Sequence, residues 1–123
     1  AYLSDHFTRP YPFSPTVVID IEPVWNRVID AVDFHSSQFY DWLAYNHFYE
    51  DEVPQDPAER KVWLSGKMKD RIGPLADRYR DLVIEIYGPE RGKEIQLIDA
   101  FEPCEYGSPL TSDNVKTLFP FLP

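Results

Sequence analysis

The chain has a single cysteine and few cations for its length. Cys104 has no second cysteine with which to form an internal disulfide, so nothing points to a disulfide-stapled secreted domain. The 12 Lys and Arg side chains are outnumbered by 21 Asp and Glu, which gives a formal net charge of -9. Because binding to phosphates needs clustered cations and no basic stripe occurs, we expect no nucleic-acid partner. A cytoplasmic location fits best.

Long apolar runs are also missing. The stretch from Leu82 to Ile86 is interrupted by Glu85 and is far shorter than the roughly 20 residues that cross a bilayer, so no membrane partner is expected. The first residue is Ala, and no charged start leads into an apolar run, so no signal peptide is evident and we expect the chain to begin within a longer protein. What is present is 43% apolar and 15% aromatic residues, enough for a small core.

Two segments have the composition of β-strands. Val17 to Ile21 is a β-branched run typical of a buried strand, and Ile95 to Phe101 is a weaker candidate. Residues 1 to 16 are rich in proline and aromatic side chains, which predicts an extended segment. A strand cannot satisfy its own backbone groups, so Val17 to Ile21 must pair with other strands, and none is evident nearby in the sequence.

Helical patterns dominate the rest of the chain. Proline, glycine and capping residues divide it into four expected helices: about Pro23 to Tyr45, Asp56 to Ile72 with a break or kink at Gly73-Pro74, Leu75 to Ile86 with a stop at Gly88-Pro89, and a short one through Leu118 capped by Thr111 or Ser112. Asp56, Pro57 and Glu59 form a capping-box arrangement. The final residues, Phe119 to Pro123, are expected to dock as an extended apolar strip.

Charge and apolar patterns indicate how these helices pack. Arg78 and Arg80 stand among acidic residues and are expected to form solvated ion pairs. Apolar residues of the first helix recur at three-and-four spacing and predict one buried stripe: Trp25, Val28, Ile29, Val32, Phe39, Trp42 and Leu43.

Few residues of the kind that carry chemistry stand together. His35 falls on the apolar stripe, where it is either a core histidine with one satisfied nitrogen or part of a pocket wall. Ser37 has no base fixed beside it and is expected to be polar filler. The run from His47 to Glu52 is interpreted as a solvated acidic loop, because a zinc site needs three or four convergent ligands. Cys104 is expected to be a packed thiol.

Several of these pieces together are similar to a known family. A strand ending in Asp20-Ile21, then a helix with His35-Ser36-Ser37-Gln38, resembles the PIG-L/LmbE-like zinc-dependent N-deacetylases. The later Phe101-Glu102-Pro103-Cys104-Glu105-Tyr106-Gly107 is similar to the family's Phe-Glu-x-x-x-Tyr-Gly stretch. The closing Leu118-Phe119-Pro120-Phe121 is similar to endings of large bacterial members. The resemblance extends roughly from Tyr2 to Phe121.

The resemblance implies an α/β fold in which residues 1–123 are the C-terminal portion of a Rossmann-like deacetylase domain, helix-rich with few strands of its own. The family's N-terminal half carries His-Pro-Asp-Asp and a later histidine motif that bind zinc and supply the base, and neither motif occurs here. Zinc is therefore implied for the intact protein only, with no catalytic or metal-ligating residue in this chain. The implied partner is the missing N-terminal half or another chain. The implied substrate-binding residue is Gln38, with His35 second, because an amide can hydrogen-bond sugar hydroxyls.

The implied reaction is hydrolysis of an N-acetyl group from an amino sugar or its conjugate, with this chain inactive alone. Residues 50–92 are longer and more helical than a minimal member needs, so we expect them to form either a cap or an oligomer surface between copies. The alternative function is a non-catalytic, mainly helical interaction module, in which the stripe from Trp25 to Leu43 binds a partner helix.

Overall fold

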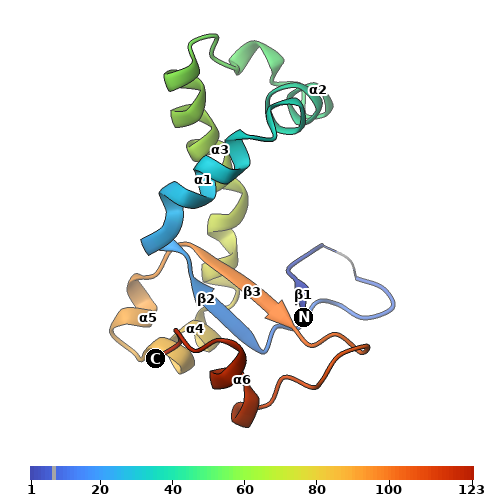
Figure 1. Cartoon of the computed structure of the whole chain (residues 1–123), viewed down its shortest axis with the longest axis vertical. Coiled ribbons are helices and arrows are strands. Elements are labelled where there is room, and N and C mark those ends of the chain that lie inside the picture. Colours follow the sequence, from blue (N-terminus) through green and yellow to red (C-terminus); the bar gives the residue numbers. More distant parts are fainter. Residues whose placement is uncertain (7) are drawn as a thin grey trace. The chain divides into compact units, whose positions relative to one another are not determined.

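The computed structural model describes residues 1–6 and 8–123, so Phe7, an aromatic residue of the expected extended segment, lies outside the described residues. The chain divides into two compact units (Figure 1): residues 1–22 with 73–123, here the sheet unit, and residues 23–72, here the helical unit. The structure is mixed α/β, as predicted, with more helix than strand and a three-stranded antiparallel sheet. Among the described residues no helix is both long enough and apolar enough to cross a membrane.

The sheet unit contains all the strands of the described residues. Its sheet has the order β1-β3-β2, and both neighbouring pairs are antiparallel. Val17–Asp20 therefore finds its partner in the weaker strand candidate, far along the chain, and both strand predictions are confirmed. The elements of this unit are β1 (Tyr2–Leu3), β2 (Val17–Asp20), the end of α3 (Pro57–Arg78), α4 (Arg80–Tyr87), α5 (Arg91–Glu94), β3 (Ile98–Glu102) and α6 (Ser112–Leu118).

The core of the sheet unit lies between one face of the sheet and α4. Val18 of β2 lies opposite Ala100 of β3, and both side chains are completely buried. Ile98, two residues before Ala100 on the same face of β3, is completely buried as well. Val83 of α4 and Ile95 join them in one apolar cluster. Fully burying an aliphatic side chain of this size contributes roughly 1.5–3 kcal/mol, so this cluster is the main source of stability in the unit.

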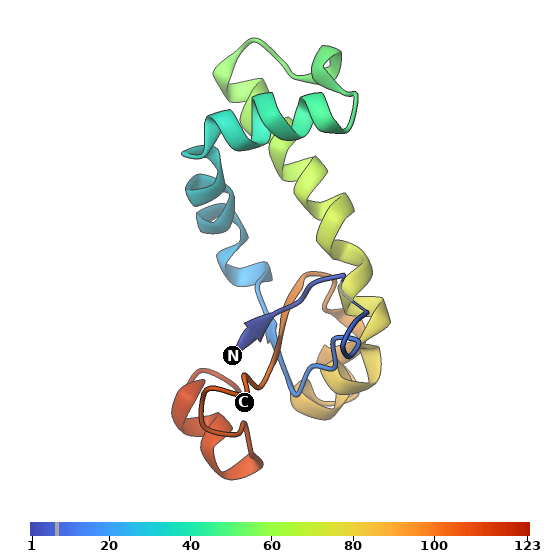
Figure 2. The ribbon, with the colours of Figure 1, turned by 90° about the vertical axis from the view of Figure 1, so that its right-hand side faces the viewer.

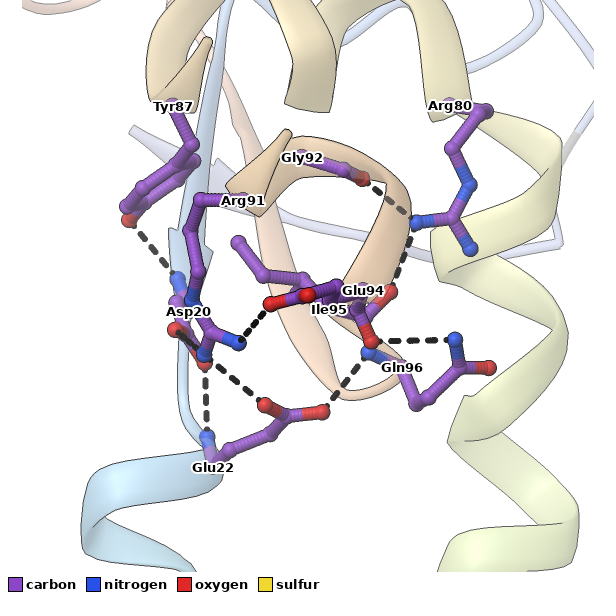
Figure 3. A network of polar contacts seen from close by, with 9 residues as sticks. All are labelled: Asp20, Glu22, Arg80, Tyr87, Arg91, Gly92, Glu94, Ile95 and Gln96. Atoms are coloured by element: carbon purple, nitrogen blue, oxygen red, sulfur yellow. Dashed lines mark hydrogen bonds and ion pairs between the residues drawn. The ribbon is translucent and has the colours of Figure 1, made fainter. Parts of the chain in front are cut away.

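A polar network joins the end of β2 to the α5 turn (Figure 3). Arg91 Nη2 donates to Asp20 Oδ2 at 2.5 Å and to Glu22 Oε2 at 2.9 Å. The other Glu22 oxygen accepts the backbone N–H of Gln96 at 2.7 Å, and the Tyr87 hydroxyl accepts the backbone N–H of Asp20 at 2.8 Å. Burial of the Tyr87 hydroxyl raises its pKa.

Arg80 has a larger structural role than the solvated ion pair that the sequence predicted. It does pair with Asp77 at 2.7 Å, but its Nη1 also donates to the carbonyl oxygens of Gly92 at 2.8 Å and Ile95 at 2.6 Å. A carbon added at Gly92 would lie 2.6 Å from the Ile84 Cα, so α5 packs directly on the backbone of α4. Arg80 is the first residue of α4. It therefore ties the segment that follows α4 back to the beginning of that helix.

The helical unit is built differently from the predicted continuous helix over Pro23 to Tyr45. α1 ends at Asp33, and Figure 2 shows the chain turning before the π-helix η2 begins. The prediction of one unbroken helix is therefore wrong. The elements of this unit are η1 (Glu22–Val24) apart from its first residue, α1 (Trp25–Asp33), η2 (Ser37–Trp42), α2 (Leu43–Asn46), η3 (Glu50–Glu52) and α3 as far as Ile72.

The break has a local cause and a packing cause. Ser36 and Ser37 have side chains that compete for backbone hydrogen bonds, which weakens a helix at that point. After the turn, the Tyr40 ring lies 6.1 Å from the Trp63 ring and its hydroxyl donates to Asp33 Oδ1 at 2.5 Å. These contacts fix the segment after the turn against Asp33 and α3.

The break also changes which residues are buried. Trp25 and Ile29 are buried as predicted, and the Trp25 Nε1 donates to Ser65 Oγ at 2.9 Å. Trp42 is 56% exposed, so its assignment to the interior is wrong. Tyr40 and Ala44 are buried instead, because the π-helix rotates the positions that follow it.

α3 continues through Gly73 and Pro74, where a break was predicted. The residue before a proline is normally kept out of helical conformation partly by a clash of its Cβ with the proline ring, and Gly73 has no Cβ. The other helix ends agree with the sequence. Asp56 Oδ1 accepts the N–H groups of Ala58 and Glu59 at 2.9 and 3.0 Å, Gly88 ends α4 with φ +82°, and Thr111 caps α6.

The tail after α6 docks through one ring. Phe119 is half-buried and its ring lies 5.8 Å from that of Phe101 on β3. The Leu122 N–H donates to the Phe119 carbonyl at 3.1 Å, so the tail forms a turn instead of the predicted extended strip. Phe121 stays mostly exposed.

Candidate functional site

The run that carries the family resemblance lies where α1 gives way to η2. The His35 and Gln38 side chains are both exposed, so the interpretation of His35 as a core histidine is wrong. The His35 carbonyl accepts the N–H groups of Gln38 and Phe39 at 2.9 and 3.1 Å, and the Gln38 carbonyl accepts the N–H of Leu43. The backbone of this run therefore initiates the π-helix.

The π-helix lines an open groove of about 660 Å³ in the helical unit. Ser37, Asp41 and Trp42 come from η2, and Tyr45 from α2. Glu50, Val53, Gln55 and Arg60 line it as well, from η3, the connection after it and α3. Single π-helical turns are rare and recur at functional sites, and the volume lies within the roughly 300–1,000 Å³ of small-molecule sites. This groove is the candidate functional site.

The floor of the groove is a fixed pair of side chains. Tyr40 is buried, and burial together with its hydrogen bond to the Asp33 carboxylate raises the pKa of its hydroxyl. The Arg60 guanidinium lies 5.1 Å from the centroid of the Tyr40 ring. Arg60 also donates from Nε to the Pro54 carbonyl at 3.1 Å and from Nη2 to the Gln55 carbonyl at 3.3 Å. These contacts orient Arg60 and use two of its five N–H donors.

The walls combine flat apolar rings with hydrogen-bonding groups. Trp42 and Tyr45 are large exposed aromatic residues, which offer ring faces to a ligand. Asp41 and Glu50 add carboxylates, and Gln55 adds an amide. A sugar has an apolar face of C–H groups and a rim of hydroxyls, so a groove with ring faces and polar atoms fits this class of ligand.

A cation–π contact holds the wall that bears Glu50. Lys67 Nζ lies 4.6 Å from the Tyr49 ring centroid and 5.6 Å from that of Trp63, and it pairs with Glu52 Oε2 at 2.6 Å. Tyr49 and Glu52 lie on either side of Glu50 in the chain, so Lys67 anchors the η3 turn to α3. The groove wall is therefore formed by a restrained turn.

The residues predicted from the sequence lie beside this groove rather than in it. Ser37 lines it, whereas Gln38 and His35 are not among its lining residues. Sequence reasoning missed Trp42 and Tyr45, the first because it was assigned to the core. A signal was present, since aromatic residues at both positions together with Tyr40 do not fit one helical stripe.

The residues of this chain do not by themselves fit the zinc that the resemblance implies. Among residues 1–6 and 8–123, no three His, Cys, Asp or Glu side chains form a group that could hold a metal ion. The His47 ring stacks on Tyr49 with centroids 5.9 Å apart, and Glu50–Glu52 are exposed, as expected for a solvated acidic turn.

The second stretch of the resemblance follows β3 in the sheet unit. Cys104 is half-buried and free, and the Gly107 N–H donates to its carbonyl at 3.0 Å in a turn. Hydrogen bonds from the Tyr2 hydroxyl and the Tyr106 N–H lower the pKa of the Cys104 thiol, while the contact raises that of Tyr2. This stretch and the groove belong to different units.

The chain matches no protein-family model, no curated protein and no solved structure. The functional proposal therefore depends on the residue pattern and on the groove of the helical unit.

Proposed function

We propose that this chain is the C-terminal part of a zinc-dependent N-deacetylase resembling the PIG-L/LmbE-like family, and that the groove of the helical unit binds its N-acetylated amino sugar. One observation carries the proposal. The run from His35 to Gln38, on which the resemblance depends, initiates a π-helix whose next residues line a groove of aromatic and hydrogen-bonding side chains.

Each lining residue has a role in binding and orienting the sugar. Trp42 and Tyr45 stack on its apolar face, and Ser37 and Gln55 hydrogen-bond its hydroxyls. Gln38 is an additional polar contact at the edge of the site, with His35 second. All of these groups act in binding, because a glutamine amide cannot act as a general base at neutral pH.

The metal-binding half is proposed to come from the missing N-terminal segment or from another chain. The metal-binding half would supply a zinc ion as a Lewis acid for the acetamide carbonyl and for the attacking water. This chain positions the sugar, and alone it is inactive. A cytoplasmic location is part of the proposal and is supported by the acidic balance and the single cysteine.

We further propose that the sheet unit is the edge of a Rossmann-like sheet. Antiparallel strands do occur at the edge of otherwise parallel sheets, which supports this reading of the β1-β3-β2 arrangement. Within residues 50–92, η3 and the start of α3 line the groove. This supports a cap over the substrate site more than an oligomer surface.

The proposal is tested on the protein encoded by the complete reading frame. Its coding sequence should contain His-Pro-Asp-Asp upstream of this chain, and the zinc-loaded protein should release acetate from an N-acetylglucosamine conjugate. Trp42→Ala and Gln38→Ala should raise KM more than they lower kcat, because both residues act in binding. Phe34→Ala, at an exposed aromatic residue outside the groove, is the matched control. An upstream sequence without metal motifs, or no acetate release, would refute the proposal.

A specific observation keeps the helical interaction module as the second candidate. Phe34 and Phe48 are 88% and 90% exposed and lie outside the groove. The stripe from Trp25 to Leu43 is less available than expected, because Trp25 and Ile29 are buried. Two results together would favour the interaction module. The chain would bind no sugar, and the double variant Phe34→Ala with Phe48→Ala would no longer associate with another protein that the parent chain binds.

A further inference from the structure

The sheet of the sheet unit has a second face, on the side away from its core. Val18, Ile98 and Ala100 point into the core with α4. Because side chains alternate along a strand, Ile19 of β2 and Asp99 of β3 point to the second face, where they lie directly opposite each other. Both residues are only half-buried, so the second face is incompletely covered at this position.

Asp99 lies among apolar neighbours on this face. Val17 and Phe101 form the next cross-strand pair on the second face, and Val17 is completely buried. The tail covers that end, since the Phe119 ring lies 5.8 Å from the Phe101 ring. Among the residues of β2 and β3 on the second face, Asp99 is the charged one. An apolar surface with one carboxylate in it therefore lies partly exposed beside the docked tail.

The Asp99 carboxylate has no partner in the part of the chain that the structure describes. It forms neither a hydrogen bond nor an ion pair there. Burial raises its pKa above the ordinary value of 3.8, which means that water solvates this carboxylate less well than an exposed one. A charge that is partly removed from water costs free energy unless a cation or a hydrogen-bond donor meets it. The carboxylate therefore indicates the chemistry of a partner, which the apolar residues alone would not.

We propose that the second face is the docking surface for a helix of the missing N-terminal half, and that this helix presents an arginine or lysine to Asp99. The inference rests on the proposed function, which supplies the missing half. Sheets in α/β domains bury both faces under helices, and in this unit α4 covers the other face. Apolar residues on either side of the cation cover Ile19, and the cation forms a charge-assisted hydrogen bond with Asp99. A helix with a carboxylate at that position would be repelled by Asp99.

The test compares Asp99→Leu in the 123-residue chain and in the protein encoded by the complete reading frame. In the 123-residue chain the substitution removes an unpaired carboxylate and adds apolar contact with Ile19, so the melting temperature should rise by about 2–4 °C. In the complete protein it leaves the partner's cation without its carboxylate, so the melting temperature should fall by at least about 2 °C. A purely structural role of Asp99 in the sheet would give a shift of the same sign in both proteins.

Asp113→Leu is the matched control. Asp113 is exposed on α6 of the same unit and belongs to neither strand of the second face. Its substitution should shift the melting temperature by the same small amount in both proteins, because no partner meets it in either one.

A second measurement reads the carboxylate directly. The chemical shift of the Asp99 carboxyl carbon, followed by NMR during acid titration, gives its pKa in each protein. In the 123-residue chain we expect this pKa to lie above 3.8, because burial is the cause that acts there. In the complete protein it should lie below 3.8, because a nearby cation favours the charged form.

The outcomes separate this inference from the proposed function. A rise in melting temperature in both proteins, or an Asp99 pKa that stays raised in the complete protein, would overturn the docking surface. A reading frame that encodes no further segment would overturn it as well. Neither measurement involves zinc or sugar, so acetate release decides the deacetylase proposal independently. A complete protein that pairs Asp99 but releases no acetate would keep the docking surface and refute the proposed activity.

Discussion

The sheet unit and the helical unit place their apolar side chains differently. In the sheet unit, aliphatic residues such as Val18, Val83 and Ile98 are completely buried, and a polar network closes the end of the sheet (Figure 3). In the helical unit the largest apolar residues are divided, with Trp25 buried and Trp42 exposed. Both units expose large aromatic side chains, such as Tyr106 and Phe121 in the sheet unit, but Trp42 and Tyr45 of the helical unit also border a groove. The comparison favours a framework role for the sheet unit, and under our proposal the groove of the helical unit is the binding surface.

The sharpest test of this division is a pair of tryptophan substitutions in the helical unit. Trp25 is 7% exposed and its Nε1 donates to Ser65, so Trp25→Ala should lower the free energy of unfolding by about 3–5 kcal/mol. Trp42→Ala should cost less than about 1 kcal/mol, because that ring stays largely in solvent in the native state. Denaturant titration followed by circular dichroism measures both. Similar losses for the two variants would contradict the division.

A pair of arginine substitutions tests the framework role of the sheet unit. Arg80→Met removes two charge-assisted hydrogen bonds to the Gly92 and Ile95 carbonyls, so we expect a loss of about 1.5–3 kcal/mol. Arg78→Met removes an exposed guanidinium that lies 5.2 Å from the Tyr79 ring, and should cost less than about 1 kcal/mol. Thermal or urea unfolding of both variants checks the difference. An Arg80 variant as stable as the parent would mean that solvent replaces these bonds.

Two glycines sharpen the same contrast. A Cβ at Gly92 would lie 2.6 Å from the Ile84 backbone, so Gly92→Ala should force α5 away from α4 and cost about 1–3 kcal/mol. Gly66 lies within α3 with open space around its Cα, so Gly66→Ala should stabilise the helix by about 0.5–1 kcal/mol. Opposite shifts in the melting temperature are the expected result, and shifts of the same sign would count against the close helix packing.

Local patterns gave most of the secondary structure, and tertiary effects account for the misses. The strand at Val17–Asp20 and the cap at Asp56 follow from short-range chemistry, so they were predictable. The pairing of that strand with Ile98–Glu102 was not, because the two segments are far apart in the sequence. The continuation of α3 through Pro74 was missed because proline propensity was judged without its glycine neighbour.

The candidate site was harder to predict than the fold. The π-helix is accompanied by contacts of Tyr40 with Asp33 and with Trp63 of α3, and the contact with Trp63 joins segments that are far apart in the sequence. Because the π-helix forms, Trp42 lies on the groove wall and not in the core, where it was predicted. The groove also needs Glu50 and Arg60, which come from separate elements, so only the folded chain brings the set together.

The smallest expected effect concerns a half-buried carboxylate in the sheet unit. Burial raises the pKa of Asp99 above its ordinary value of 3.8, so the folded state holds this proton more tightly than the unfolded chain does. The contribution of Asp99 to the free energy of unfolding should therefore fall as the pH rises from about 3.8 through the raised folded-state pKa. Asp99→Asn should lessen that decline, and Asp113→Asn, exposed on α6, should not. Urea unfolding at a series of pH values provides the check, and parallel curves for Asp99→Asn and the parent would contradict the burial effect.

The central claim is that the helical unit binds an amino sugar and the sheet unit does not. Backbone amide chemical shifts of the full chain, recorded by NMR during titration with the N-acetylglucosamine trimer, test it most directly. The account predicts saturable changes concentrated in Ser37–Tyr45 and Glu50–Arg60, with β2, β3 and α4 unchanged. Changes centred on the sheet unit, or no saturable change at all, would contradict it.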